Sequence, residues 1–364
     1  ALLASVAMTP NQFATATAVD GLAIDQGLLV PLTQLDAADA MAAIDQLSGE
    51  AHASGQAVLL DSSRMIRNAA LARAAHGQDA FTAQRDGDAT TGAWIDINRQ
   101  GGRIAGDGNA ARVQSSSSNV LVGIDHSFAG WRVGAFGGTG RTDASVRERN
   151  ARLETDSVHL GVYASRAWGP VGLRAGVSHA SYDVDAERSV AFQGFSDAPL
   201  ARYDADAWQG FVGAGWRLDA GAWSFEPYLQ YAHVELDTDG FAEQGDAAAL
   251  NVDAATARAD LTTAGMRFAV ALRGTGQEQS WLSLRGNLGY RHAGGDQVQA
   301  IRARWEGGDA FTVRSPAVTD EAMLVEVGLA ARTSANSLFE VGYSGQLSDD
   351  ARDHGANARF SVQF

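Results

Sequence analysis

Hydrophobic positions recur every three or four residues in the first 80 or so residues, which predicts helices. Thr9, Pro10 and Gln12 form a capping-box start with Pro at the first helical position. A second helix is predicted by one apolar stripe, at Ala37, Ala40, Met41, Ile44 and Leu47. A third is predicted over residues 56–75, which contain no Gly or Pro. At about 1.5 Å per residue this helix is about 30 Å long, close to the height of a membrane barrel.

From about residue 80 the period becomes 2 and stays so to the end, which predicts strands. About twelve segments have the length that membrane barrels use. They are residues 92–103, 115–128, 131–146, 152–168, 171–187, 202–219, 222–238, 255–274, 279–293, 320–334, 337–348 and 355–364.

The connections between these strands alternate in length. Short links follow the even strands: Ala129-Gly130, Gly169-Pro170, Ala220-Gly221, a turn at Gly276, and Ala335-Asn336. Longer polar links mostly follow the odd strands: 104–114, 188–201, 239–254, 294–319 and 349–354. The link 147–151 is the shortest of the second set and is a candidate strand extension. Tight turns at one rim and long loops at the other are typical of bacterial outer-membrane barrels, whose short turns are periplasmic.

The strands have one apolar and one ionic face. In 202–219, Trp208, Val212 and Trp216 share a face opposite Gln209 and Arg217. A soluble β-sandwich would place such apolar faces in a shared core. A membrane barrel is favoured because Trp residues flank the short turns, as in an interfacial aromatic girdle: Trp131, Trp168, Trp216, Trp223 and Trp281. We predict an all-β transmembrane barrel of 12 antiparallel strands.

The last strand supports this prediction. Phe360, Val362 and Phe364 fall on one face, and Arg359 and Gln363 on the other. An apolar strand at the edge of a sheet invites unwanted pairing unless the sheet closes. We expect this strand to pair with residues 92–103 and to turn its aromatic face to lipid.

Composition narrows the function classes. A net charge of -15 argues against nucleic acid as a partner. The absence of Cys excludes disulfides, thiolate metal sites and Cys nucleophiles. No apolar run reaches the length of a membrane helix. Because no charged signal segment opens the chain, we expect it to be part of a longer precursor.

Catalytic and ligand-binding motifs are not evident. The eight His have no metal-ligand spacing, no GxSxG motif occurs, and the FGGTG text at 136–140 lacks the Lys and helix of a phosphate loop. The acidic residues Asp349, Asp350 and Asp353 are interpreted as solvated loop charge rather than a calcium site. No metal or cofactor is predicted.

Several segments together resemble the C-terminal translocator of classical type V (Va) autotransporters. The matching segments are TPNQFATATAVDGL (9–22), LSGEAHAS (47–54), LLDSSRMIRNAALARA (59–74), GAWIDI (92–97) and RFSVQF (359–364). The resemblance implies a twelve-stranded barrel with a helix in its lumen, in the outer membrane of a Gram-negative bacterium. It also implies export of a passenger attached upstream, and a terminal strand, with Phe360, Val362 and Phe364, that the barrel-assembly machinery recognises.

The resemblance divides the chain into three parts. Residues 1–55 would be passenger-proximal, 56–78 the pore helix and linker, and 79–364 the barrel. The polar residues of the pore helix would be Gln56, Asp61, Arg64, Arg67, Asn68 and Arg73. The lumen wall would present Glu226, Arg267, Arg285, Glu326, Glu340 and Arg359, and we expect the helix arginines to pair with its carboxylates. Without the resemblance, 56–75 would be interpreted as a surface helix packed on its Val58 and Ile66 side.

The predicted function is that of a non-catalytic, monomeric translocator whose pore is plugged by the helix. Its partners would be outer-membrane lipid and lipopolysaccharide, the barrel-assembly machinery and the attached passenger. The alternative is a self-sufficient outer-membrane channel or barrel enzyme. Self-cleavage at Asn68 is disfavoured, because Ala69 stands where the family pattern usually has a second Asn.

Overall fold

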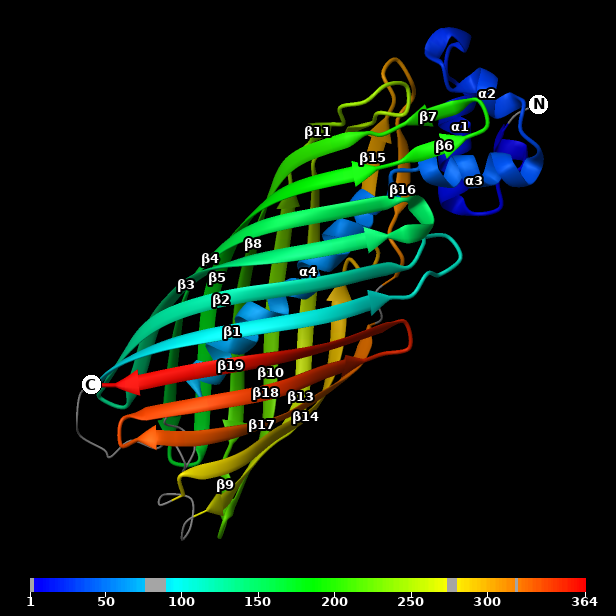
Figure 1. Ribbon diagram of the computed structural model, residues 1–364. Helices are drawn as coiled ribbons and strands as arrows, with labels where there is room; N and C mark the ends of the chain where they lie inside the picture. Colours follow the sequence, from blue (N-terminus) through cyan, green and yellow to red (C-terminus); the bar gives the residue numbers. More distant parts are fainter. Residues whose placement is uncertain (1–2, 76–89, 274–279, 318–319) are drawn as a thin grey trace.

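The computed structural model describes residues 3–75, 90–273, 280–317 and 320–364. Twelve antiparallel strands close into one barrel, with helices inside it and at one end (Figure 1). The barrel strands are β1 (Thr90–Ile104), β2 (Val113–Phe128), β3 (Trp131–Val146), β4 (Ala151–Trp168), β5 (Val171–Arg188), β8 (Leu200–Trp216) continued by β9 (Leu218–Ala220), β10 (Trp223–Thr238), β13 (Ala255–Arg273), β14 (Leu282–Gly295), β17 (Glu321–Ser334), β18 (Ser337–Leu347) and β19 (Ala351–Gln363).

The terminal strand closes the barrel, as expected. β19 pairs with β1 from Gly92 opposite Gln363 to Ile104 opposite Ala351. The backbone of Phe364 exchanges two further hydrogen bonds with Thr91. The backbone groups of β19 are therefore paired at this seam, so this apolar strand cannot pair with a strand of another molecule.

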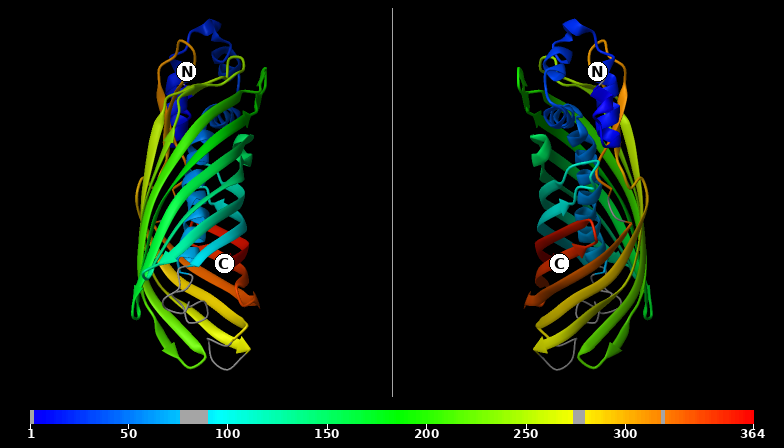
Figure 2. Two further views of the ribbon diagram at one scale, coloured as in Figure 1. Left: turned by 90° about the vertical axis from the view of Figure 1, so that its left-hand side faces the viewer. Right: turned by 90° about the vertical axis from the view of Figure 1, so that its right-hand side faces the viewer.

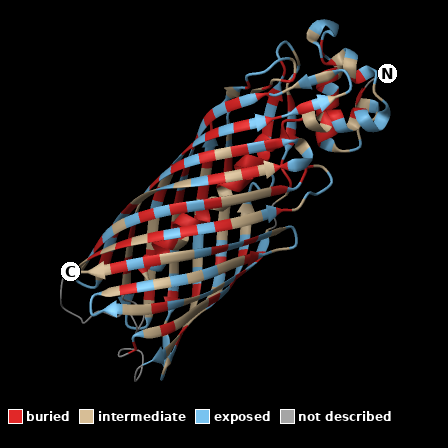
Figure 3. Cartoon of the chain, in the orientation of Figure 1, coloured by how far each residue is buried: buried red, intermediate tan, exposed pale blue. Residues whose placement is uncertain are grey.

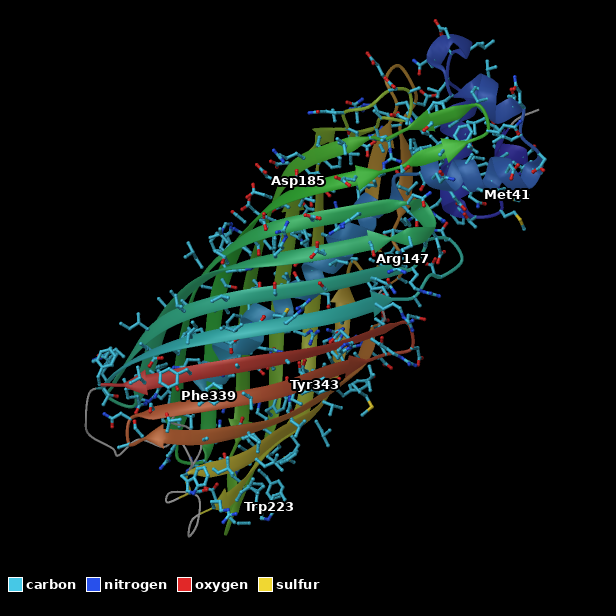
Figure 4. The ribbon with its side chains drawn as sticks, viewed as in Figure 1. Met41, Arg147, Asp185, Trp223, Phe339 and Tyr343 are labelled. Atoms are coloured by element: carbon cyan, nitrogen blue, oxygen red, sulfur yellow. The ribbon has the colours of Figure 1, made fainter. Side chains whose placement is uncertain are left out.

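The two faces of the wall alternate as predicted (Figure 3). In β8, Trp208 and Trp216 are exposed, whereas Gln209 is buried. Phe339 and Tyr343 project outward from β18 (Figure 4). Apolar side chains therefore cover the outside of the barrel and polar ones line the lumen.

Tight turns form one rim. Ala129 and Gly130 turn β2 into β3 with φ of 48° and 78°, the paired positive values that suit a two-residue hairpin. Trp223 lies at this rim (Figure 4), and the predicted Gly276 turn lies outside the described residues. The rings of Trp131 and Trp168 meet edge to face, with the guanidinium of Arg166 near both.

Two predictions for the opposite rim were wrong. The link 147–151 is a turn of 3-10 helix, η3 (Arg147–Arg149), ended by Asn150 at φ 48°, not a strand extension. The β18–β19 link has only residues 348–350, because Ser348 hydrogen bonds to Ala351 and closes the turn early. Asp353 consequently lies within β19 and is buried, not solvated.

The long loops of this rim form three hairpins. They are β6 (Val190–Phe192) with β7 (Phe195–Asp197), β11 (Phe241–Ala242) with β12 (Asn251–Val252), and β15 (Ala300–Arg304) with β16 (Phe311–Arg314). The β12 and β15 strands also pair, so two of the hairpins form one small sheet beyond the barrel.

The N-terminal helices pack on these hairpins, at the end of the barrel away from the C-terminus (Figure 1). They are η1 (Leu3–Ser5), α1 (Pro10–Asp20), η2 (Ile24–Gln26), α2 (Leu29–Thr33) and α3 (Ala37–Leu47). We call residues 3–47 and the three hairpins the cap. Its core contains Leu28, Ile44 and Trp305, each fully buried. The predicted start of α1 is confirmed, because Thr9 accepts a hydrogen bond from the Gln12 amide.

The third helix, α4 (Glu50–Ala74), runs inside the barrel (Figure 2). It starts six residues earlier than predicted, after Gly49 at φ 68°. Gly55 argued against helix in the sequence, but it is required by packing: a Cβ there would lie 2.6 Å from Leu153 Cδ2. At 25 residues, α4 is about 37 Å long and spans most of the lumen.

Candidate functional site

The contact between α4 and the inner wall is the candidate site. The helix packs against β2, β3, β4, β5 and β10. On its other side, towards β13, β14, β17 and β18, a cavity of about 310 Å³ remains. The helix therefore fills the lumen unevenly.

The last turns of α4 are anchored by a buried polar cluster. The Arg73 guanidinium donates Nη2 to Asp125 Oδ1 at 3.0 Å, and Arg132 Nη1 donates to the same oxygen at 3.0 Å. Tyr163 donates its hydroxyl to Asp125 Oδ2 at 2.7 Å and accepts Trp94 Nε1–H at 2.9 Å. Charge-assisted bonds in a dry site are among the strongest that a protein makes. This cluster fixes the helix at the short-turn rim.

Two arginines hold the middle of α4. Arg64 Nη2 donates to Asp353 Oδ2 at 2.8 Å, whereas Arg67 Nη1 donates to the neutral Gln209 Oε1 at 2.9 Å. Asp61 accepts from Gln100 Nε2 at 3.2 Å. Contacts to three different wall strands set both the height and the rotation of the helix.

The first turn of α4 is tied to the cap. Glu50 Oε1 accepts the Ala111 amide at 2.7 Å, and Oε2 accepts Asn11 Nδ2 at 3.3 Å. Burial raises the pKa of the Glu50 carboxyl, although Arg149 and these hydrogen bonds oppose that rise. Gln56, six residues further along α4, is also buried.

A second buried cluster joins the helix, the wall and a cap hairpin. Glu243 accepts from Arg188 Nε and from His52 Nε2, each at 2.7 Å, and from the Leu250 amide at 2.9 Å. Burial favours the neutral form of Glu243, but the charge and hydrogen bonds of Arg188, aided by His52, outweigh it and hold the pKa of the carboxyl well below its usual range. Glu243 thus stays ionised and clamps α4 to the outer loops.

Arg64 and Arg73 pair with the wall carboxylates Asp353 and Asp125, not with the three glutamates named from the sequence. Among the described residues, no ion pair joins Arg64, Arg67 or Arg73 to the three predicted glutamates. The glutamates lie across the cavity from the helix or pair within the wall. Glu226 binds Arg174 and Arg267, Glu340 binds Arg285 with Arg359 nearby, and Glu326 lines the cavity.

Arg359 is an exception on the wall, because it reaches α4. Its Nη2 donates to Asp96 Oδ2 at 2.8 Å and to the Ala69 carbonyl at 3.4 Å. Together with Asp353, it gives the inner face of β19 two contacts to the helix. Asn68 lines the cavity. Phe360 and Phe364 are exposed on the outer face, with Val362 between them half-buried.

Sequence reasoning missed Asp125, Tyr163, Trp94, Arg188 and Glu243. The glycines at inward-facing positions near Trp94 and Tyr163 could have indicated this cluster from the sequence. A Cβ on Gly123 would lie 2.4 Å from the Trp94 ring, and one on Gly134 2.4 Å from Tyr163. A glycine at an inward-facing position leaves room in the lumen, which a large side chain from a neighbouring strand can occupy.

Within the described ranges, no group of three or more His, Asp or Glu could hold a metal ion. In the same ranges, no helix has the length and hydropathy to cross a membrane.

Known proteins share this architecture. A family profile described as the autotransporter beta-domain matches residues 93–344, more than half of the chain. The chain belongs to the autotransporter family. An extracellular serine protease of Serratia marcescens is 30% identical over 321 residues, which cover 88% of this chain and 30% of the protease. This chain therefore spans less than a third of the length of that curated relative.

Solved autotransporter structures have the same fold. The translocator domain of NalP from Neisseria meningitidis superposes with a TM-score of 0.66 at 18% identity, covering 85% of this chain and 98% of that one. The beta domain of Bordetella BrkA gives a TM-score of 0.54 at 16% identity, covering 76% of this chain and 100% of that one.

Membership of the family assigns the role and the membrane of this β-domain. It is a β-barrel translocator domain of the Gram-negative outer membrane. The short-turn rim is periplasmic, and the cap lies at the outer rim.

Proposed function

We propose that this β-domain exports its passenger and then remains closed by α4. The observation that supports the proposal is the path of the chain. The cap lies at the outer rim, α4 runs down the lumen, and Arg73 ends near Asp125 at the periplasmic rim, where β1 begins. Chain preceding the cap therefore emerges outside the cell, while the barrel stays in the membrane.

The proposed division of the chain follows the helix. Residues preceding Gly49 form the passenger-proximal part, α4 is the plug, and the strands from Thr90 onward form the translocator. In this proposal the first boundary is Gly49, six residues before residue 55, and the start of α4 at Glu50 supports it. The predicted boundary near residue 78 lies outside the described residues.

Conductance in planar bilayers tests the plug. The full chain is expected to conduct weakly, and a chain lacking residues 1–78 to conduct strongly, because removal of α4 opens a polar, water-accessible lumen. Both proteins are first checked for a folded barrel by their heat-dependent shift on gels. Equal conductance of the two folded proteins contradicts the plug.

The passenger is proposed to be a protease, by similarity to the Serratia marcescens extracellular serine protease. Bacteria expressing the complete precursor should hydrolyse casein at the cell surface or in the medium, and a serine-protease inhibitor should abolish this activity. Cells expressing only residues 1–364 provide the matched control, and we expect them to be inactive.

Release by self-cleavage within α4 is not part of the proposal. The Asn68–Ala69 bond lies within α4, and Ala69 stands where the family pattern usually has a second Asn. Mass spectrometry of the folded precursor should find this bond intact. A fragment ending at Asn68 contradicts the expectation.

We further propose that the domain acts as a monomer and that the barrel-assembly machinery binds the β19 residues Phe360, Val362 and Phe364. Their outer face presents two exposed aromatic rings at the end of the chain. Deletion of Phe364 should lower the amount of folded barrel in the outer membrane. The control is Phe339→Ala, which removes an exposed aromatic ring from the outer face of the neighbouring strand β18 and leaves the terminal residue in place.

A further inference from the structure

The cavity beside α4 has an unusual charge. Nine arginines and four carboxylates line it, in a chain whose net charge is -15. Asp96, Glu226 and Glu340 are already engaged with wall arginines. Positive charge is thus concentrated on the open side of the lumen.

Arg67 is a buried member of this set without an ion-pair partner among the described residues. Its side chain is 3% exposed, and its one hydrogen bond to the wall goes to the neutral amide of Gln209. Among the described residues no carboxylate lies within 4.0 Å of it, and its Nε is buried without a hydrogen-bond partner. Arginine does not lose its proton in proteins, so this site holds a permanent buried charge.

The neighbours of Arg67 increase the imbalance. Arg64, one turn earlier, and Arg291 on β14 repel its charge, and among the described residues Asp61 attracts it. Asp61 is 4.0 Å from Arg291 and 3.8 Å from Arg64, so its charge is shared. Arg291 is also buried, donates to the neutral Gln346 at 2.7 Å, and has an Nε without a partner.

An uncompensated buried charge strongly destabilises a fold unless a counter-charge reaches it. The cavity offers the place for one. Arg64, Arg67 and Arg291 all line it, and its volume of about 310 Å³ exceeds the roughly 30 Å³ that a water occupies in the liquid. The planar fork of a guanidinium suits an oxyanion, which accepts two parallel hydrogen bonds.

We propose that the lumen of this β-domain binds a small oxyanion of the phosphate or sulfate type, anchored by Arg67 and flanked by Arg64 and Arg291. The anion supplies the counter-charge that the wall lacks beside the middle of α4. It thereby holds the helix in the lumen together with Asp125 and Asp353. The site is reached from the periplasmic half, since the cavity extends to Arg217 and Ser224 near the short turns.

Crystals of the detergent-solubilised full chain, soaked in selenate, give a direct test. Selenate is a tetrahedral oxyanion whose selenium is visible by anomalous scattering. An anomalous peak within about 4 Å of the Arg67 guanidinium supports the proposal. The absence of a peak there, in crystals that show selenate elsewhere, overturns it.

Thermal unfolding in solution gives an independent test. Phosphate replaces chloride at constant ionic strength, and the midpoint of unfolding of the wild type should rise with the logarithm of phosphate concentration, because only the folded state binds. Arg67→Gln should remove this rise, and Arg67→Lys should reduce it. The control Arg141→Gln alters an exposed arginine on β3 and should retain the full rise.

Equal slopes for Arg67→Gln and the wild type overturn the proposal, since phosphate would then act elsewhere. If Arg67→Gln does not fold, Arg67→Lys and the selenate crystals of the wild type still decide the question.

Discussion

The outer and inner halves of α4 are held in different ways. From Glu50 to Leu59 every residue is buried, and the helix packs among apolar groups such as Leu153, Tyr182 and Tyr203. From Asp61 to Ala74 the helix packs on one side only, against Trp94, Phe136 and their neighbours, and faces the cavity on the other. The outer half is packed on all sides and also bonds to the cap through Glu50 and His52, whereas the inner half leaves a cavity on one side and is anchored mainly by Arg64 and Arg73.

This difference locates the seal of the pore. The close-packed half lies under the cap, so the lumen is closed at its outer end, whereas the periplasmic half retains polar space. Tight apolar packing excludes water, while a charged cavity admits it. The structure therefore indicates a plug whose barrier to ions is concentrated in its outer half.

The largest effect is expected from breaking the inner anchor. Asp125→Ala leaves Arg73 and Arg132 buried and unpaired, and removes the acceptor of the Tyr163 hydroxyl. Loss of one partner of a buried pair lowers the free energy of unfolding by about 3–5 kcal/mol. Urea unfolding of the purified barrel measures this change.

The control for this substitution is Asp143→Ala, which removes an exposed carboxylate on β3 that pairs with Arg152. Exposed pairs contribute at most about 1 kcal/mol. If both variants unfold at the same urea concentration, the inner half of α4 is not anchored by Asp125.

The cap provides the next test, because its core is separate from the lumen. Trp305→Ala removes a buried ring that stacks on Phe311 at 4.8 Å and should lower cap stability by about 3–5 kcal/mol. Hydrogen exchange should accelerate in α1 and α3 but not in the barrel strands. Trp208→Ala, on the exposed outer face of β8, should leave cap exchange unchanged. Acceleration throughout the barrel would show that the cap and the barrel unfold as one unit.

The sequence predicted the wall well, for a physical reason. Lipid outside and polar groups inside impose opposite requirements on successive residues. The alternation of apolar and polar residues in β8 or β18 therefore predicts which side chains face outward. The short turns could also be read, because Ala129-Gly130 and similar pairs suit few other structures. The pairing of β19 with β1 followed from the need to close the barrel.

The contacts of α4 could not be predicted in the same way. Which wall residue lies at the height of Arg64 or Arg73 depends on the stagger of the strands, which no local pattern encodes. Asp353 was expected in a loop, but the turn closed by Ser348 starts β19 at Ala351, so Asp353 lies within that strand. The cap was also missed, since the docking of residues 3–47 on distant hairpins is purely tertiary.

A matched pair of substitutions sharpens the contrast between the two halves of α4. Gly55→Val inserts a side chain where a Cβ alone would lie 2.6 Å from Leu153, so it should destabilise by about 1–3 kcal/mol. Ala72→Val adds similar bulk on an exposed position that lines the cavity, and should change stability by less than about 0.5 kcal/mol. Urea unfolding of both variants compares the two halves directly, and equal losses would contradict a seal confined to the outer half.

The smallest effect concerns pH, and it separates the two carboxylates that join α4 to the cap. The pKa of Glu243 is lowered in the folded state, so its contribution to stability is complete above the ordinary value of about 4.5 and declines as the pH falls below it. The pKa of Glu50 is raised, so its protonation on mild acidification favours the folded state. The cap should therefore remain docked at pH 5 and loosen only at lower pH.

Exchange of the Leu250 amide reports this loosening, because it donates to Glu243. Glu243→Gln should exchange faster at neutral pH, since Arg188 loses its counter-charge, and should lose the acid dependence. Glu235→Gln, which alters an exposed carboxylate on β10, should retain it. A cap that loosens between pH 7 and 5 in the wild type would contradict this assignment, because protonation of Glu50 in that range favours the folded state and Glu243 stays ionised.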